Sequence, residues 1–170
     1  MELHQGRALI DWAEARVAAL PRKKRRKAGR MSMITPLLLV GNRQAAHDES
    51  LLTTHRIDAV VNVGGGHNPF PDRPAYLRRV LPDRPDADML SLLPELCDFI
   101  HSHHQQGRRV LVHCMGGISR SPTVCAAHLV RHRELTLDEA LAVLKLGRPT
   151  ARPNHGFLTQ LRRWEARCAE

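Results

Sequence analysis

The chain alternates short apolar runs with longer segments in which apolar residues recur at helical spacing. Strands are predicted over 37–40, 59–63, 76–81 and 110–112. Helices are predicted over 2–20, 88–106, 119–132, 136–146 and 154–167. Because helical segments separate the strands, the pattern indicates an α/β fold, with a central, mostly parallel sheet of four to five strands flanked by helices.

Residues that cap helices mark several of these boundaries. Asp88 is placed to cap the helix that runs to about Gln106. Thr136 and Glu139 have the spacing of a capping box, and Asn154 is placed to cap the last helix. These residues predict where three of the helices begin.

The last predicted strand leads directly into a segment rich in glycine and polar residues. It reads His113-Cys114-Met115-Gly116-Gly117-Ile118-Ser119-Arg120-Ser121, and a predicted helix follows. The two glycines allow successive backbone N–H groups to point inward, and the helix dipole adds positive potential at the same place. We therefore expect a loop that binds a phosphate group. Its expected phosphate-contacting residues are Met115, Gly116, Gly117, Ile118, Ser119 and Arg120.

The side chains of this loop indicate what happens after the anion binds. Cys114 lies where a helix N-terminus and a neighbouring cation favour a thiolate, so it is the expected nucleophile. Arg120 offers a planar fork that can bind two phosphate oxygens. Ser121 would help Cys114 depart from a cysteinyl-phosphate intermediate, and His113 would orient the loop from beneath. This chemistry requires no cofactor.

The leaving group of such a reaction needs a proton from an acid elsewhere in the chain. Asp83 is the first candidate, because it lies in a proline-flanked loop after a predicted strand. Asp86 and Asp88 are competitors, although Asp88 is better used as a helix cap.

These residues resemble a known signature. His113-Cys114-x-x-Gly117-x-x-Arg120-Ser121 looks like that of the protein tyrosine phosphatase superfamily, and the run from Gly116 to Ser121 resembles its dual-specificity branch, in which alanine is usual at the position of Gly116. The resemblance extends from about Ile34 to Glu165. It implies a phosphatase that acts on phosphotyrosine and on phosphoserine or phosphothreonine in proteins, and it also places the general acid at Asp83.

Other functions remain open at this point. Neutral side chains at Met115, Ile118 and Ser119 argue against polyphosphorylated inositides, but simpler lipids, phosphorylated glycans or nucleotides are alternative substrates. A phospho-binding module without turnover and a rhodanese-like sulfurtransferase are further alternatives. The Arg120-Ser121 pair fits the sulfurtransferase poorly.

The basic residues are concentrated in one segment. The net charge is +9, and residues 21–30 carry seven lysines or arginines and no acid. We therefore expect two regions, an N-terminal helix with a basic linker over 1–30 and a catalytic domain over 31–168. Residues 22–30 are either a solvated linker or a contact for an acidic partner, nucleic acid or an anionic surface, or for nuclear import in a eukaryote.

The remaining cysteines and histidines suggest no further chemistry. Four cysteines without regular spacing indicate a reducing, cytoplasmic location, and no apolar run is long enough for a membrane span. Cys97 and Cys125 are expected to pack in the core, with a protective disulfide to Cys114 as the alternative. His101, His103 and His104 are expected on the solvated surface rather than around a metal.

Overall fold

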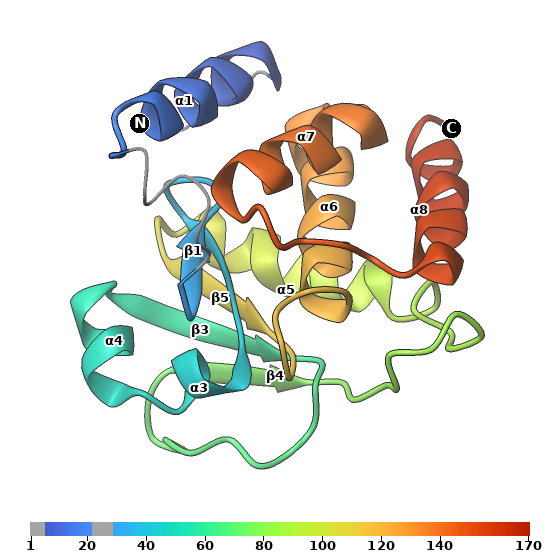
Figure 1. Cartoon of the computed structure of the whole chain (residues 1–170). Coiled ribbons are helices and arrows are strands. Elements are labelled where there is room, and N and C mark those ends of the chain that lie inside the picture. The colour runs from blue at the N-terminus through green and yellow to red at the C-terminus, as the bar shows by residue number, and fades with distance from the viewer. Residues whose placement is uncertain (1–5, 22–28) are drawn as a thin grey trace.

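The computed structural model describes residues 6–21 and 29–170 of the 170-residue chain (Figure 1). Its strands are β1 Met31–Met33, β2 Leu38–Gly41, β3 Ile57–Asn62, β4 Ala75–Arg78 and β5 Arg109–His113. They form one sheet in the order β1-β2-β5-β3-β4, in which only β1 runs antiparallel to its neighbour. The predicted α/β fold with a mostly parallel central sheet is confirmed.

Helices cover both faces of this sheet (Figure 1). The helices of the described ranges are α1 Gly6–Ala18, α3 Arg43–Ala46, α4 Glu49–Thr54, α5 Leu93–His104, α6 Arg120–Arg133, α7 Leu137–Gly147 and α8 His155–Cys168. Helices α5 and α6 pack on one face, and α7 and α8 pack against α6. The short helices α3 and α4 lie on the opposite face.

Alternation along the strands divides the core between these two faces. In β5, Val110 and Val112 join the larger apolar cluster under α5 and α6, whereas Leu111 joins the smaller cluster with Ala46 and Leu52. Successive side chains of a strand point to opposite faces, so a central strand that is apolar throughout is buried on both.

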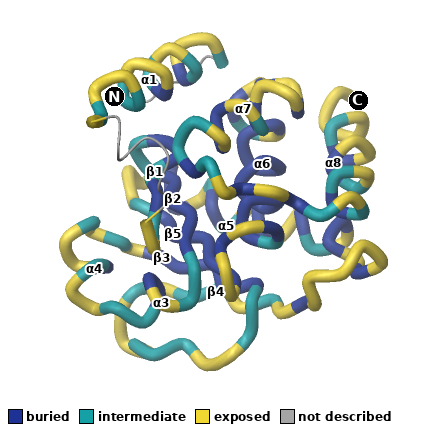
Figure 2. The backbone as a smooth tube through the Cα atoms, viewed as in Figure 1, coloured by how far each residue is buried: buried dark blue, intermediate teal, exposed yellow. Residues whose placement is uncertain are grey.

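Helix α6 is the most enclosed helix of the described chain. Every residue over 121–130 is buried, and Figure 2 shows the helix surrounded by its neighbours. Its N-terminus follows directly from the phosphate-loop segment that begins at the end of β5. The sheet and the core therefore hold that segment at both ends.

The N-terminal helix packs on the rest of the chain. In α1, Leu9 and Ala13 are buried, and the Arg16 guanidinium donates to the Met33 carbonyl over 3.1 Å. The predicted helix is confirmed over Gly6–Ala18. Most of the predicted basic linker, residues 22–28, lies outside the described residues.

Two of the three predicted helix caps are confirmed. Thr136 and Glu139 form a complete capping box, and the Asn154 side chain accepts from the Phe157 N–H. The prediction for Asp88 was wrong: α5 starts only at Leu93, after a residue that makes no side-chain capping bond.

A local turn explains the late start of α5. The Asp88 side chain accepts from the Ser91 N–H over 3.1 Å. Aspartate bonds of this kind stabilise a turn in competition with a helix. Helix α5 instead begins near Pro94, which is tolerated in a first turn because its missing N–H would have no intrahelical acceptor.

Several short elements escaped the prediction. The strand expected over 76–81 is β4, Ala75–Arg78, and β1, α3 and α4 were not expected at all. Helices α3 and α4 are short and are held at their starts by side-chain caps from Asn42 and Asp48. Elements of four to six residues are too short to show a periodic pattern.

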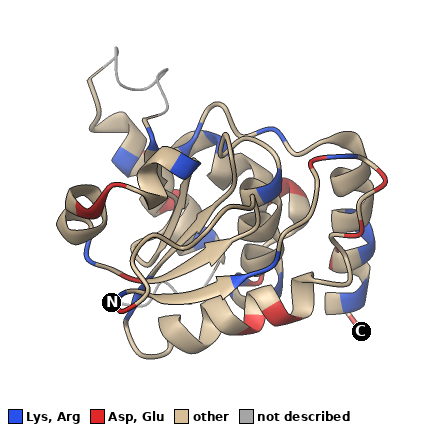
Figure 3. Cartoon of the chain, turned by 90° about the horizontal axis from the view of Figure 1, so that it is seen from below, with Lys and Arg blue, Asp and Glu red and all other residues tan. Residues whose placement is uncertain are grey.

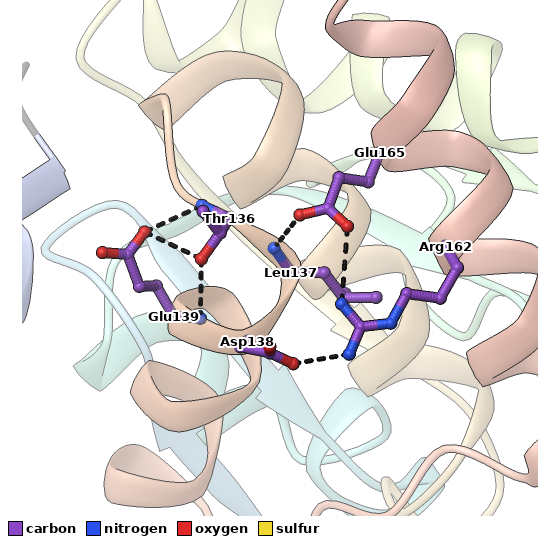
Figure 4. Close-up of polar contacts among 6 residues, drawn as sticks. All are labelled: Thr136, Leu137, Asp138, Glu139, Arg162 and Glu165. Atoms are coloured by element: carbon purple, nitrogen blue, oxygen red, sulfur yellow. Dashed lines mark hydrogen bonds and ion pairs between the residues drawn. The ribbon is translucent and has the colours of Figure 1, made fainter.

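The start of α7 is tied to α8 by surface polar contacts (Figure 4). Arg162 pairs with Asp138 over 2.6 Å and with Glu165 over 3.4 Å. Glu165 also accepts from the Leu137 N–H over 2.6 Å. These contacts tie the first turn of α7 to the C-terminal half of α8.

Charge is dispersed over the described surface. Figure 3 shows lysine and arginine on several helices and loops, with acidic residues interspersed. No helix of the described ranges combines the length and apolar character that a membrane crossing requires.

Candidate active site

Three neighbouring parallel strands end side by side at the loop that follows β5. In register, Gly41 of β2 and Asn62 of β3 both lie opposite His113 of β5. Ligand sites form outside the carboxyl ends of such strands. The loop from Cys114 to Ser119 therefore begins at the position where an α/β sheet offers a site.

Cys114 lies at the bottom of this loop. Its residue is 2% exposed, its sulfur accepts from the Gly117 N–H over 3.2 Å, and the Ser121 hydroxyl lies 3.2 Å from the same sulfur. Both neighbours can donate to a sulfur that carries negative charge. The structure thus brings together the predicted nucleophile and the group predicted to assist its departure.

Two glycines allow the backbone to close around the cysteine. Gly117 has φ +64°, and a Cβ there would lie 2.6 Å from the Gly41 carbonyl oxygen. A Cβ on Gly64 would lie 2.5 Å from the Cα of Cys114. Both distances are shorter than Cβ contacts allow, so only glycine fits at either position without movement of the loop.

Arg120 reaches from the start of α6 toward the rim of the loop. Its guanidinium donates to the Leu81 carbonyl over 3.1 Å and to the Gly64 carbonyl over 3.4 Å. Its Nε is buried and has no hydrogen-bond partner in the described part of the chain. A buried donor without an acceptor is costly, and an anion in the loop would supply one.

Arg148, which the sequence analysis did not identify, holds the loop from behind. Its Nε donates to the Gly117 carbonyl over 2.6 Å, and a terminal nitrogen donates to the Gly116 carbonyl over 3.3 Å. The other terminal nitrogen donates to the Ser32 hydroxyl and the Gly29 carbonyl, both over 2.9 Å. These bonds supply donors to two loop carbonyls and tie the loop to the segment before β2.

His113 is buried below the loop. Its Nδ1 lies 3.4 Å from the Cys114 carbonyl oxygen, and burial lowers its pKa to about 4. The ring is therefore neutral at physiological pH, and it can orient the loop without adding positive charge. Its ring lies against the Cys114 carbonyl, and its orienting role stays a prediction.

Asp83 and Asp86, two of the three candidate acids, have different surroundings, and Asp88 is used in the turn to Ser91. Asp83 accepts from the Asn154 side-chain amide over 2.9 Å, and it follows Leu81, whose carbonyl is bound by Arg120. Asp86 pairs with Arg84 over 2.6 Å, and this hydrogen bond lowers the pKa of its carboxyl group. Asp83 is linked through Asn154 to Ser119 of the loop, whereas Asp86 is held by Arg84, so these contacts favour Asp83.

Asn154 also connects the acid loop to the phosphate loop. Its backbone N–H donates to the Ser119 hydroxyl over 3.0 Å, while its side-chain amide donates to Asp83. Within the loop, the apolar side chains of Met115 and Ile118 are 52% and 46% exposed. The two loops and the N-terminus of α8 therefore form one connected site.

The remaining cysteines lie apart from this chemistry. Cys97 and Cys125 are buried free thiols whose pKa values are raised by burial, and Cys168 is an exposed free thiol. The predicted packing role of Cys97 and Cys125 agrees with this burial. A disulfide from either to Cys114 is not formed.

The histidines of α5 differ from the prediction. His103 and His104 are buried, at 9% and 2% exposed, so the expectation of a solvated surface was wrong for both. Within the described ranges, no three histidine, cysteine or acidic side chains are arranged to hold a metal ion.

The chain is similar to dual specificity phosphatases in sequence and in fold. The family model "Dual specificity phosphatase, catalytic domain" matches residues 38–167. Mouse dual specificity phosphatase 28 is 40% identical over 134 residues, which are 78% of this chain and 82% of that protein. Mouse dual specificity protein phosphatase 19 is 36% identical over 136 residues, which are 79% of this chain but only 62% of that protein. The crystal structure of human DUSP28 superposes with a TM-score of 0.81 at 33% identity, and the match covers 85% of this chain and 98% of that one.

Proposed function

The chain belongs to the dual specificity phosphatases, and we propose that it hydrolyses phosphomonoesters on phosphotyrosine and on phosphoserine or phosphothreonine in proteins. Members of this family are cysteine-dependent hydrolases, and Cys114 is the nucleophile of this chain under the proposal. The observation that carries it is the Cys114 sulfur, which contacts the Gly117 N–H and the Ser121 hydroxyl at the base of a loop capped by Arg120.

In the first step, the Cys114 thiolate attacks phosphorus and forms an S–P bond. The bond from phosphorus to the leaving oxygen breaks, and Asp83 donates its proton to that oxygen. The loop N–H groups and Arg120 bind the phosphoryl oxygens on which negative charge develops. The unpartnered Nε of Arg120 gains a hydrogen bond when the substrate binds.

In the second step, water attacks phosphorus and the S–P bond breaks, which releases inorganic phosphate and the Cys114 thiolate. Asp83, now a carboxylate, accepts a proton from the water. The Ser121 hydroxyl donates to the departing sulfur, from which it lies 3.2 Å away. The enzyme thus returns to its starting state without an external cofactor.

The rim of the loop supports a peptide substrate. Exposed apolar side chains at Met115 and Ile118 offer contacts to the residue that carries the phosphate. No lysine or arginine lies between Cys114 and Arg120 to bind additional phosphates of an inositide. Simple lipids, glycans or nucleotides, and phosphate binding without turnover, are the alternatives to be tested.

Hydrolysis of a small aryl phosphate and of phosphopeptides by wild type, Cys114→Ser and Asp83→Asn tests the proposal. We expect Cys114→Ser to be inactive and Asp83→Asn to lower kcat about 100-fold, because general acid catalysis contributes about 10²–10⁴. A folded wild type that binds phosphopeptides without turnover would identify a binding module. Turnover restricted to lipid, glycan or nucleotide phosphates would replace the protein substrate.

The acid assignment has its own test in the pH profile. In this proposal the protonated form of Asp83 limits the rate as pH rises, so Asp83→Asn flattens the alkaline limb of kcat against pH. Asp86→Asn serves as the matched control. If Asp86→Asn rather than Asp83→Asn flattens that limb, Asp83 is not the acid.

We further propose a cytoplasmic location and a contact of residues 22–30 with an acidic partner or anionic surface. The seven basic residues of the 21–30 segment support this proposal. A variant of the full chain with glutamine in place of those lysines and arginines tests this proposal. Cell fractionation measures its location, and binding to anionic vesicles measures the contact with an anionic surface. Unchanged distribution and unchanged vesicle binding would reduce the segment to a linker.

A further inference from the structure

A second pocket opens beside the phosphate loop. It has a volume of about 410 Å³ and is lined by Asn42, Arg43, Gln44, His47 and Met115. The Arg43 N–H donates to the Met115 carbonyl over 3.1 Å, and Met115 directly follows Cys114. The pocket therefore shares a wall with the proposed catalytic site.

Two arginines converge on one glycine between this pocket and the nucleophile. A Cβ on Gly66 would lie 3.1 Å from a terminal nitrogen of Arg43, and the Arg78 Nε donates to the Gly66 carbonyl over 2.8 Å. At the other end of the same turn, Gly64 packs against Cys114. A single turn thus separates the nucleophile from two guanidinium groups.

The charge of these arginines is not neutralised within the described ranges. Arg43 and Arg78 form no ion pair there, whereas the adjacent Arg79 pairs with Glu95 through two nitrogens. His47 lies in edge contact with His67, with ring centroids 5.2 Å apart.

The pKa of His47 agrees with a positive local field. Burial lowers it first, and the charges of Arg43 and His67 lower it further. Arg43 lines the pocket and Arg78 approaches from the other side of Gly66. Two guanidinium groups that form no ion pair within the described ranges are suited to an anionic ligand.

We propose that Arg43 and Arg78 form a subsite for a second anionic group of the substrate, a carboxylate or second phosphoryl group on the peptide that carries the hydrolysed phosphate. The inference rests on the proposed phosphatase function and adds a determinant of its substrate choice. An extended peptide advances roughly 3.3 Å per residue, so a neighbour of the phosphorylated residue can cross the short turn from Gly64 to Gly66.

The test compares peptides that differ in one flanking residue. A phosphotyrosine peptide is prepared with glutamate, glutamine or phosphoserine at each position next to the phosphotyrosine, and kcat/KM is measured for wild type, Arg43→Gln and the double variant Arg43→Gln/Arg78→Gln. We expect wild type to prefer one acidic peptide over its glutamine counterpart about tenfold, as one charge-assisted hydrogen bond implies. Arg43→Gln lowers that preference, and the double variant abolishes it.

Arg79→Gln is the matched control, because Arg79 lies next to Arg78 but pairs with Glu95. It should keep the full preference. The small aryl phosphate, which has no second anion, shows whether the catalytic loop of each variant is intact. A larger preference for phosphoserine than for glutamate identifies a second phosphoryl group as the ligand, and the reverse identifies a carboxylate.

The outcomes separate the two proposals. If wild type hydrolyses neither the peptides nor the aryl phosphate, the proposed function fails. If wild type hydrolyses both but shows no acidic preference, only the subsite is overturned. The subsite is also overturned if the preference survives in the double variant.

Discussion

The two ends of α6 lie against polar regions that differ in one respect. In one region the buried donors have acceptors, which we call matched, and in the other most ring nitrogens have no hydrogen-bond partner among the described residues, which we call unmatched. At its N-terminus, the Arg148 guanidinium meets acceptors on Gly29, Ser32, Gly116 and Gly117. Toward its C-terminus, α6 contributes to a histidine cluster that has few such partners. The members of this cluster are His101 and His104 of α5 and His128 and His132 of α6.

Most contacts of the histidine cluster are between its own rings. His104 and His128 meet edge to face at 4.9 Å between centroids, and His101 stacks on His132 at 4.0 Å. The exception is His104, whose Nε2–H donates to the Leu37 carbonyl over 3.0 Å, so this nitrogen carries the proton. Neither nitrogen of His128 has a hydrogen-bond partner in the described part of the chain.

This difference separates two uses of buried polar groups. Matched donors and acceptors hold a fixed geometry, which the phosphate loop requires. Unmatched histidines stay neutral because burial penalises their charged form. The nearby Arg131 and Arg133 oppose protonation of the cluster, while Asp98 favours it. We therefore expect the loop to be sensitive to substitution and the cluster to be sensitive to acid.

Removing the matched guanidinium should have the largest effect. Arg148→Met fills similar space but leaves the Gly116 and Gly117 carbonyls without their donors. We expect kcat/KM to fall at least ~100-fold and the free energy of unfolding to fall by about 3 kcal/mol, as when one partner of a buried polar network is removed. Aryl phosphate turnover and urea unfolding measure the two effects.

The exposed Arg163 of α8 provides the control, as Arg163→Met. It should alter neither quantity appreciably. Activity of Arg148→Met within about threefold of wild type would contradict the role assigned to the guanidinium, since positioning effects of catalytic loops are commonly on the order of 10²-fold.

Low pH should destabilise the folded protein through the histidine cluster. Burial lowers the pKa of His104 to about 3 and that of His128 well below its usual value of 6.5. The unfolded chain therefore takes up these protons near pH 6.5 while the folded chain does not. The free energy of unfolding falls as pH drops below 6.5, by up to about 2 kcal/mol per fully buried histidine at pH 5.

Replacing His128 by leucine removes both unpartnered nitrogens and one of these titrations. We expect His128→Leu to lose less stability than wild type between pH 7 and pH 5, by about 2 kcal/mol. Urea unfolding at both pH values measures this, with the exposed His155→Leu as control. An unchanged pH dependence in His128→Leu would show that this ring does not carry the acid sensitivity.

Asn154 allows local structure and catalysis to be separated. Its side chain caps α8 and also donates to Asp83. Asn154→Ala should lose about 1 kcal/mol of stability as a lost cap and lower kcat roughly tenfold through a misplaced acid. Thr136→Ala loses the cap of α7 without a link to Asp83. If both variants kept full kcat, the bond from Asn154 would not position the acid.

The sequence allowed prediction of features that depend on nearby residues. Short segments could be recognised from their residue spacing alone. Examples are the helix caps at Thr136 and Asn154 and the loop from Cys114 to Arg120. The prediction for Asp88 was wrong because an aspartate side chain can either cap a helix or stabilise a turn. In this structure Asp88 accepts from the Ser91 N–H in a turn.

Features assembled from distant segments could not be predicted in this way. Arg148 binds Gly29, Gly116 and Gly117, so its role depends on the folded chain rather than on its neighbours in sequence. Its only local signal is an arginine between Gly147 and a proline. The burial of His104 likewise follows from the packing of α5 on α6.

The smallest effect is expected where polar groups are matched but exposed. Arg162 pairs with Asp138 and Glu165 on the surface, where water competes for the charges and salt screens them. Arg162→Gln should give no resolvable change in the urea midpoint at physiological salt and should leave aryl phosphate turnover unchanged, because Glu165 still accepts from the Leu137 N–H. Urea unfolding at low and high salt measures this. A loss of unfolding free energy as large as that of Asn154→Ala, at both salt concentrations, would contradict this expectation. It would mean that an exposed ion pair stabilises this protein as much as a helix cap does.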